Sequence, residues 1–123
     1  MKTERRAVAR YQEKLAVQIN MNDFSTPATA MEISLRGLRV VCEGPAASGM
    51  FSRYIRVTPG ENIIVDMQIK LPNPSGLEES LGFQTKVISV NRVSQNSYVV
   101  GFEIVKLATN DLKVWQDYIT SKH

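Results

Sequence analysis

The sequence predicts an all-β fold with a C-terminal helix, arranged as a six-stranded antiparallel β-barrel. Apolar and polar residues alternate in six short segments between residues 15 and 104, which is typical of strands with one buried face. Turn-forming residues such as glycine, proline, asparagine and serine separate the segments, and after residue 107 the apolar period becomes helical. Short turn-linked strands favour a closed barrel, because closure removes exposed sheet edges.

The clearest strand covers residues 63–71, where every second residue is apolar. Residues 43–60 are expected to form mainly a long connection, because glycines and prolines interrupt them, with room for a short element at residues 50–57. The other five strands are expected at residues 15–19, 28–35, 38–42, 83–93 and 98–104.

Residue parity in the second expected strand assigns its side chains to two faces. The inward face is expected to hold Thr29, Met31, Ile33 and Leu35, and the outward face Ala28, Ala30, Glu32 and Ser34. Gly37 follows, where a glycine permits a bend or a bulge. The polar residues of this strand are therefore expected on the outer wall of the barrel.

The last segment, residues 108–121, is expected to be one amphipathic helix of about three turns. Its helically spaced apolar residues are Leu112, Trp115 and either Tyr118 or Ile119. Trp115 is expected to pack the helix onto the barrel.

The composition is that of one ordinary globular domain over residues 1–123, with 43% hydrophobic and 22% charged residues. Within it we expect a flexible arginine-rich arm at residues 1–12, the barrel at 13–107 and the helix at 108–121. The whole net charge of +3 belongs to residues 1–12, because the remaining acidic and basic residues balance. A protein that follows a nucleic-acid backbone usually spreads its basic residues over a face, so this short cluster suits a small anion better.

Several function classes lack their residues in this sequence. Catalysis and metal binding by histidine are not expected, because the only histidine is the C-terminal His123, and no phosphate-binding glycine loop is present. We therefore expect neither an enzyme nor a cofactor. A single cysteine, Cys42, fits a reducing compartment, and the lack of a long apolar run predicts a cytoplasmic protein without membrane insertion.

Two short motifs remain as candidates for function. Arg6 and Arg10 have the spacing RxxxR, and Arg5 adds a third guanidinium beside them. About 22 residues later, Glu32 begins a Glu-x-Ser-x-x-Gly sequence that ends at residue 37. Each motif alone has a plain explanation, as a solvated basic terminus or as outward polar residues before a turn.

Together, and in this order, the two motifs resemble the paired signature of bacterial PilZ domains, RxxxR followed by (Asp/Asn)-x-Ser-x-x-Gly. Further resemblances lie in the sequences GLRV at 37–40, Pro-Gly at 59–60 and VGF at 100–102, so the likeness spans nearly the whole chain. It implies a six-stranded PilZ-like barrel with a C-terminal helix. Many members of the family bind the second messenger cyclic di-GMP. The departure is Glu32, where the family usually has Asp or Asn.

The resemblance implies a cyclic di-GMP site, and the chemistry of the residues agrees with it. Arginine can bond the O6 and N7 atoms of guanine together, grip phosphate oxygens or stack on a purine, and a carboxylate can accept the donor edge of the base. Backbone amides near the glycine and a serine hydroxyl can meet phosphate or base atoms. The site is expected to comprise Arg5, Arg6, Arg10, Glu32, Ser34 and Gly37.

The expected function is that of a cyclic di-GMP receptor or adaptor, whose N-terminal arm closes over the ligand and which signals to an unidentified effector protein, in motility or biofilm regulation. The alternative is a PilZ-like protein-interaction module that does not bind the nucleotide, because a fold does not determine a function. A single-stranded nucleic-acid binder needs aromatic and basic residues interleaved on one face. Only Tyr54, between Arg53 and Arg56, has that pattern, and we interpret it as a solvated loop, with no DNA or RNA partner.

Overall fold

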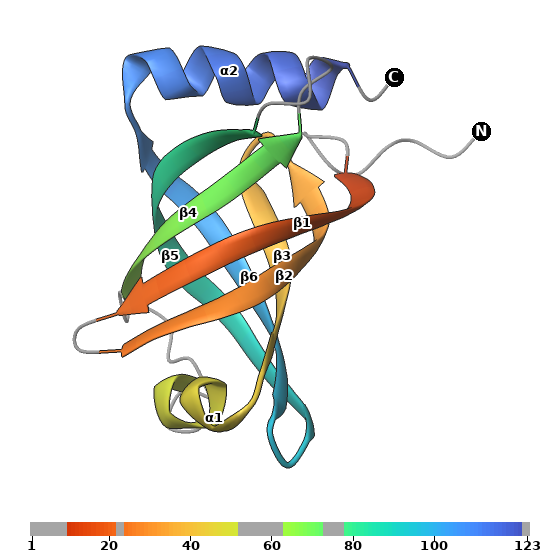
Figure 1. Ribbon diagram of the computed structural model, residues 1–123, viewed down its shortest axis with the longest axis vertical. Helices are drawn as coiled ribbons and strands as arrows, with labels where there is room; N and C mark the ends of the chain where they lie inside the picture. Colours follow the sequence, from red (N-terminus) through yellow and green to blue (C-terminus); the bar gives the residue numbers. More distant parts are fainter. Residues whose placement is uncertain (1–9, 22–23, 52–62, 73–77, 122–123) are drawn as a thin grey trace.

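The computed structural model describes residues 10–21, 24–51, 63–72 and 78–121, and these form a closed antiparallel barrel of six strands (Figure 1). Around the barrel the strands follow the order β1-β2-β3-β6-β5-β4. The predicted fold class is therefore confirmed. The strands are β1 (Arg10–Met21), β2 (Phe24–Ser34), β3 (Gly37–Glu43), β4 (Ile64–Pro72), β5 (Glu78–Ser94) and β6 (Ser97–Leu107).

Two three-stranded units close on each other to form the barrel. Strands β1, β2 and β3 pair in chain order, as do β4, β5 and β6, so local pairing accounts for four of the ladders. The remaining two ladders pair β1 with β4 and β3 with β6. Since every strand has two neighbours, the barrel has no free sheet edge.

The core lies inside the barrel, and the predicted alternation is most regular in β4 and β3. In β4 the buried and exposed residues alternate along the whole strand. In β6 the inward residues Tyr98, Val100 and Phe102 are all buried. The inward hydroxyl of Thr85 donates to the carbonyl oxygen of Val65 at 2.9 Å, so burying this polar group leaves no unmet hydrogen bond.

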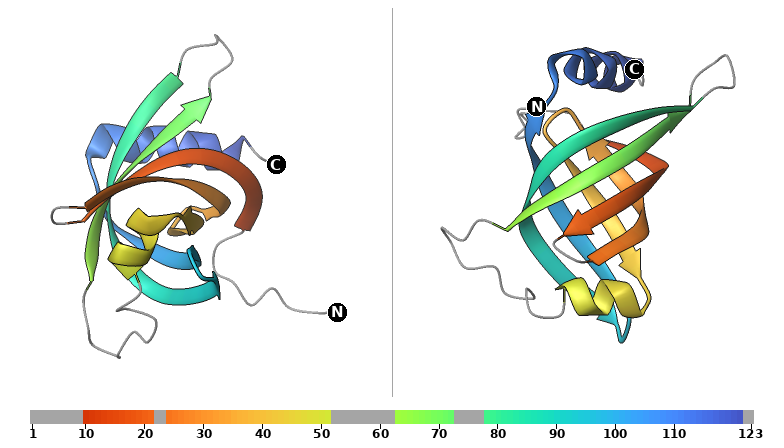
Figure 2. Two further views of the ribbon diagram at one scale, coloured as in Figure 1. Left: turned by 60° about the horizontal axis from the view of Figure 1, so that its bottom comes forward. Right: turned by 60° about the vertical axis from the view of Figure 1, so that its left-hand side comes forward.

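Helix α2 (Thr109–Thr120) lies across one end of the barrel, and helix α1 (Pro45–Phe51) lies at the opposite end (Figure 2). The fully buried indole of Trp115 packs edge-to-face on Phe83, with ring centroids 5.1 Å apart. The expected packing role of this tryptophan is confirmed. The expected apolar helix face is only partly correct, because Leu112 is 41% exposed while Ile119 is buried.

Helix α1 (Pro45–Phe51) occupies the first part of the connection expected at residues 43–60, where a short element was expected only at residues 50–57. Its residues Ala47, Met50 and Phe51 are buried at helical spacing, so the segment closes this end of the barrel. Proline at the first helical position suits a helix start, because its missing N–H has no intrahelical partner there. The proline is visible in the sequence as a signal for a helix start, but the three glycines between residues 43 and 60 favoured the prediction of a connection. Residues 52–62, including the Tyr54 segment, lie outside the described part.

Strand β2 corrects the predicted parity of residues 28–35. Ala30 faces the core and is fully buried, whereas Met31 is only half-buried. The ladder with β3 changes register between Ala30 and Glu32, and the ladder with β1 also changes register opposite Met31. A β-bulge therefore shifts the alternation by one residue, after which Ile33 faces inward as predicted.

The boundary between arm and barrel also differs from the expectation. Strand β1 begins at Arg10, so residues 10–12 pair with β2 and do not belong to the arm. Tyr11 gives the physical reason, because it stands opposite Ile33 and packs against the core.

Candidate functional site

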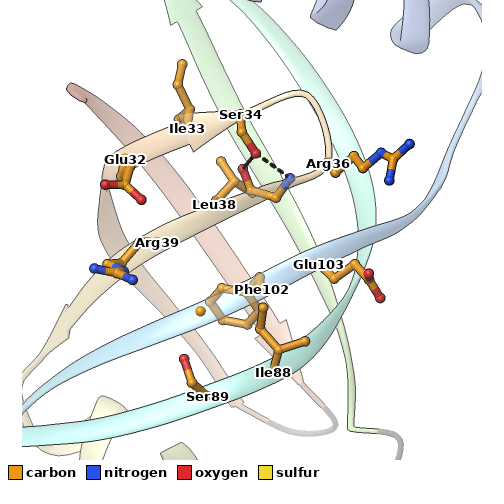
Figure 3. A pocket seen from close by; sticks show the side chains of 12 residues that line it. Glu32, Ile33, Ser34, Arg36, Leu38, Arg39, Ile88, Ser89, Phe102 and Glu103 are labelled. Carbon is orange, nitrogen blue, oxygen red and sulfur yellow. Dashed lines mark hydrogen bonds between the residues drawn. The ribbon is translucent and has the colours of Figure 1, made fainter. Parts of the chain in front are cut away.

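A groove of about 190 Å³ lies on the outer wall of the barrel (Figure 3). It extends from the end of β2 and the β2–β3 turn across β3 and β6 to β5, so it joins segments far apart in the sequence. Its lining residues are Glu32, Ile33, Ser34, Arg36, Gly37, Leu38, Arg39, Ile88, Ser89, Gly101, Phe102 and Glu103. The expected motif residues Glu32, Ser34 and Gly37 are thus all part of one concave surface.

The turn between β2 and β3 is held by hydrogen bonds on three sides. The Ser34 hydroxyl accepts the Gly37 N–H at 3.1 Å and donates to the Gly37 carbonyl at 3.3 Å (Figure 3). From β6, the Ile104 N–H donates to the Arg36 carbonyl at 2.8 Å. From α2, the indole N–H of Trp115 donates to the Leu35 carbonyl at 3.2 Å. The turn therefore presents its side chains from a rigid backbone.

Gly37 is required by the approach of β3 to β6. A Cβ atom at this position would lie 2.5 Å from the carbonyl oxygen of Phe102, closer than real Cβ atoms come to backbone. The glycine thus has a packing role in addition to its place in the motif.

A row of neighbouring strand positions crosses the groove. Glu32 of β2 stands opposite Arg39 of β3, which in turn stands opposite Gly101 of β6 and, beyond it, Ser89 of β5. Directly opposed residues of antiparallel strands project on the same side of the sheet, with Cβ atoms about 4.5–5.5 Å apart. Figure 3 accordingly shows Glu32 and Arg39 together at one end of the groove.

The charged residues that line the groove balance. Glu32 and Arg39 lie at one end, and Arg36 and Glu103 lie at the other (Figure 3). Two carboxylates and two guanidinium groups leave no net charge on this surface. The groove lined by the described residues therefore does not attract an anion by net charge alone.

The arginine motif meets the serine motif at the start of β1. Arg10 occupies the strand position directly opposite Ser34. The segment that carries RxxxR thus enters the barrel beside the turn that completes the second motif. Arg5 and Arg6, and the side chain of Arg10, lie outside what the structure describes.

Sequence reasoning missed nine of the twelve residues that line the groove. Arg36, Arg39, Ile88, Ser89 and Gly101 were not among the expected site residues, yet all line it. Arg39 and Gly101 did fall inside segments that resemble PilZ domains, but only the strand register shows that they are neighbours. That register is not visible in a single sequence.

Within residues 10–21, 24–51, 63–72 and 78–121, no group of three potential ligands among His, Cys, Asp and Glu is placed to hold a metal ion. Neither helix in this part of the chain has the length and apolar character that crossing a membrane requires.

Comparisons with known proteins show which solved structures share this fold. No protein-family model matches the chain, and no curated protein matches it. Among solved structures, the PilZ domain of YcgR from Escherichia coli, determined with c-di-GMP, matches with a TM-score of 0.62 at 15% identity, over 96% of this chain and 91% of that one. The fold is PilZ-like.

Two further structures share this PilZ-like fold. The inhibitor of motility MotI/DgrA of Bacillus subtilis matches 98% of this chain, with a TM-score of 0.71 and 19% identity. PlzA of Borreliella burgdorferi, in complex with c-di-GMP, matches 91% of it, with a TM-score of 0.54 and 10% identity. The chain spans about half the length of these two proteins, 52% and 50%.

Proposed function

We propose that the protein is a receptor for cyclic di-GMP, which binds across the outer-wall groove and is held by the N-terminal arginines. The site comprises Arg5, Arg6 and Arg10 together with Glu32, Ser34 and Gly37. The observation that carries the proposal is the strand pairing of Arg10 with Ser34, because it joins two motifs that are separate in the sequence. The presence of c-di-GMP in the matching structures of YcgR and PlzA supports it.

The distribution of charge indicates that the arm and the groove contact different parts of the ligand. Cyclic di-GMP carries two phosphate charges, and the balanced groove offers no net positive charge to meet them. Residues 1–10, which are the arm and the first residue of β1, contain the whole net charge of the protein, and arginine forms strong bidentate bonds to phosphate. The arm therefore supplies affinity for the phosphates, while the groove supplies contacts to the bases.

Ligand binding then orders the N-terminal segment. The arginines of the free arm repel one another, and a bound dianion removes that repulsion while it ties the arm to the barrel. The changed N-terminal surface is what an effector protein recognises.

A module that binds a protein partner without the nucleotide is the second candidate, and one observation favours it. Ser34 and Gly37 bond to each other, and Gly37 is also needed for the close approach of β3 to β6. The barrel alone thus accounts for both residues.

Calorimetric titration with cyclic di-GMP separates the two candidates. We expect the wild type to bind, and Arg6→Ala and Arg10→Ala to lose measurable binding with nearly unchanged melting temperatures. Arg10→Lys weakens binding, because the ammonium keeps the charge but loses the bidentate fork. Lys70→Ala, an exposed charge on β4, is the control and binds as the wild type does. A wild type that stays silent at high micromolar ligand supports the interaction module, and wild-type affinity in both alanine variants rejects the role of the arm.

A random single-stranded oligonucleotide, titrated in parallel, tests the nucleic-acid class, and no binding is expected.

Amide exchange measures the ordering of the arm. Exchange in residues 1–9 is expected to slow at saturating ligand, and unchanged exchange there contradicts the coupled ordering.

A further inference from the structure

We infer that Arg39 is the residue that selects guanine, by contacting the base rather than a phosphate of the ligand. The inference rests on the proposed function and extends it to a residue outside the two motifs. Three features of the groove support it: the neighbour of Arg39, the wall opposite Arg39 and the distribution of charge.

The neighbour of Arg39 is a carboxylate on the adjacent strand. Glu32 and Arg39 are register partners, and both line the same end of the groove (Figure 3). A phosphate placed there meets an attractive and a repulsive charge at similar distances, so its net attraction is small. A guanine has acceptors at O6 and N7 and donors at N1 and N2, so an adjacent guanidinium and carboxylate complement its two edges.

The wall opposite Arg39 is formed by Ile88 and Ser89 of β5, and Ile88 contributes an exposed apolar side chain. Across Gly101, the side chain of Ile88 lines the groove and is 55% exposed, at a register irregularity of β5. A Cβ atom at Gly101 would lie 2.6 Å from the Ser89 hydroxyl and 3.4 Å from Ile88 Cγ1. Glycine therefore keeps the space between Arg39 and Ile88 free of a further side chain. A planar base in this space has an apolar face to contact and a polar edge at Arg39.

The charge distribution favours binding of the phosphates away from Arg39. The described charges of the groove balance, whereas residues 1–10, which end at the strand position opposite Ser34, carry the net positive charge of the protein. Arginines of the arm can therefore bind phosphate while Arg39 contacts a base. This predicts a ligand preference, since adenine carries an amino donor where guanine has the O6 acceptor, and an arginine donor loses that partner.

The test compares cyclic di-GMP with cyclic di-AMP on the folded full chain, by calorimetry. Glutamine pairs with the N6 and N7 atoms of adenine, as arginine pairs with O6 and N7 of guanine. Arg39→Gln is therefore expected to weaken cyclic di-GMP binding by about 10- to 100-fold and to leave cyclic di-AMP binding unchanged or tighter. The wild-type preference for cyclic di-GMP therefore falls by at least the same factor.

Arg36→Gln is the matched control, because Arg36 is an exposed arginine at the other end of the same groove. The ratio of the two affinities is expected to stay at the wild-type value in this variant. An equal fall of the ratio in both variants indicates a general effect of charge and overturns the inference. An equal loss of both nucleotides in Arg39→Gln indicates a phosphate contact and also overturns it.

The apolar wall has its own variant and control. Ile88→Ser is expected to weaken binding of both nucleotides by about threefold to tenfold, because the exposed apolar surface it removes is covered by the base. Val93→Ser changes another exposed branched residue of β5, 61% exposed and outside the groove lining, and retains wild-type affinity. Equal affinities of the two variants contradict the base-binding wall.

Failure of the inference and failure of the receptor proposal give different results. If the wild type does not bind cyclic di-GMP, the proposed function fails and the inference fails with it. If the wild type binds and Arg39→Gln binds both nucleotides as the wild type does, the receptor proposal stands and only the role of Arg39 is rejected. Equal melting temperatures of the variants exclude misfolding as the cause of any loss.

Discussion

Strands β4 and β2 build two different walls of the same barrel. Both ladders of β4 keep their register over their whole length, and its residues alternate strictly between core and solvent. Both ladders of β2 change register near Met31, and β5 changes register against β6 beside Ile88. The groove lies on the irregular wall. Bulges are common next to functional sites because they re-aim side chains, and here register changes in β2 and β5 border the candidate site.

The bulge at Met31 has a direct effect on the candidate site. With unbroken alternation after the buried Ala30, the side chains of Glu32 and Ser34 would point into the core. The extra residue reverses the parity, so both line the outer groove and Ile33 enters the core instead. The regular wall thus serves stability, and the irregular wall combines stability with the presentation of polar groups.

The largest expected difference between the walls concerns core burial. Ile69→Ala, at a fully buried position of β4, is expected to lower the free energy of unfolding by about 2–5 kcal/mol. Met31→Ala, at the half-buried bulge, is expected to cost only about 1 kcal/mol. Chemical denaturation measures both. Equal costs would place Met31 inside the barrel and contradict the bulge.

Two glycines give the next contrast. Gly37→Ala is expected to destabilise the barrel by about 1–3 kcal/mol, because the new methyl group overlaps the Phe102 carbonyl. Gly82→Ala on the regular wall places its methyl group in open space and is expected to change stability by less than about 1 kcal/mol. Thermal unfolding of the pair provides the comparison. A Gly37→Ala variant as stable as Gly82→Ala means that β3 and β6 can separate at low cost.

The longer carboxylate at position 32 is expected to weaken the ligand contact made by the irregular wall. Glu32 must lose more rotamer freedom than an aspartate to hold the same bond to a base. Glu32→Asp is therefore expected to tighten cyclic di-GMP binding by up to about tenfold, or about 1.4 kcal/mol, and Glu32→Ala to weaken it. Calorimetric titration decides. If Glu32→Ala binds as the wild type does, Glu32 contributes nothing to the site.

The smallest effect is expected from the single hydrogen bond between α2 and the β2–β3 turn. Trp115→Phe removes the donor to the Leu35 carbonyl, which we expect to cost about 1 kcal/mol in the free energy of unfolding, in addition to the cost of the cavity that the smaller ring leaves in the core. The phenol of Tyr118 also donates to the Glu13 carboxylate of β1, at 3.0 Å. Tyr118→Phe serves as the comparison, because this second contact is nearer the surface. A larger loss in Tyr118→Phe would show that α2 is held mainly through β1.

The regular wall could be predicted from the sequence, and the irregular wall could not. Alternation in residues 63–71 gave the correct faces of β4, because both of its neighbours keep register. Either Ala30 or Met31 could occupy the inward position at this point of β2. The larger apolar side chain of Met31 favoured the incorrect prediction that Met31 faces the core. The bulge that decides between Ala30 and Met31 depends on pairing with β1 and β3, which a local pattern does not contain.

The candidate site shows the same division. The motif around Ser34 and Gly37 could be found by its resemblance to the PilZ signature, and both residues line the groove. Arg39 and Ile88 could not be found, because they join the motif only through the neighbouring strands and a bulge in β5. The roles of Arg5 and Arg6 remain predictions from the sequence.

Cys42 provides a chemical probe of how often the barrel opens. Its thiol is fully buried on β3, opposite Tyr98, and burial raises its pKa to about 12. Thiol reagents attack the thiolate, so at pH 8 the folded protein reacts only when the thiol becomes exposed. The labelling rate therefore measures the population of open barrels without denaturant. A ligand that binds only the closed barrel slows this labelling by the factor 1 + [L]/Kd, so cyclic di-GMP binding could be followed at a residue remote from the arm.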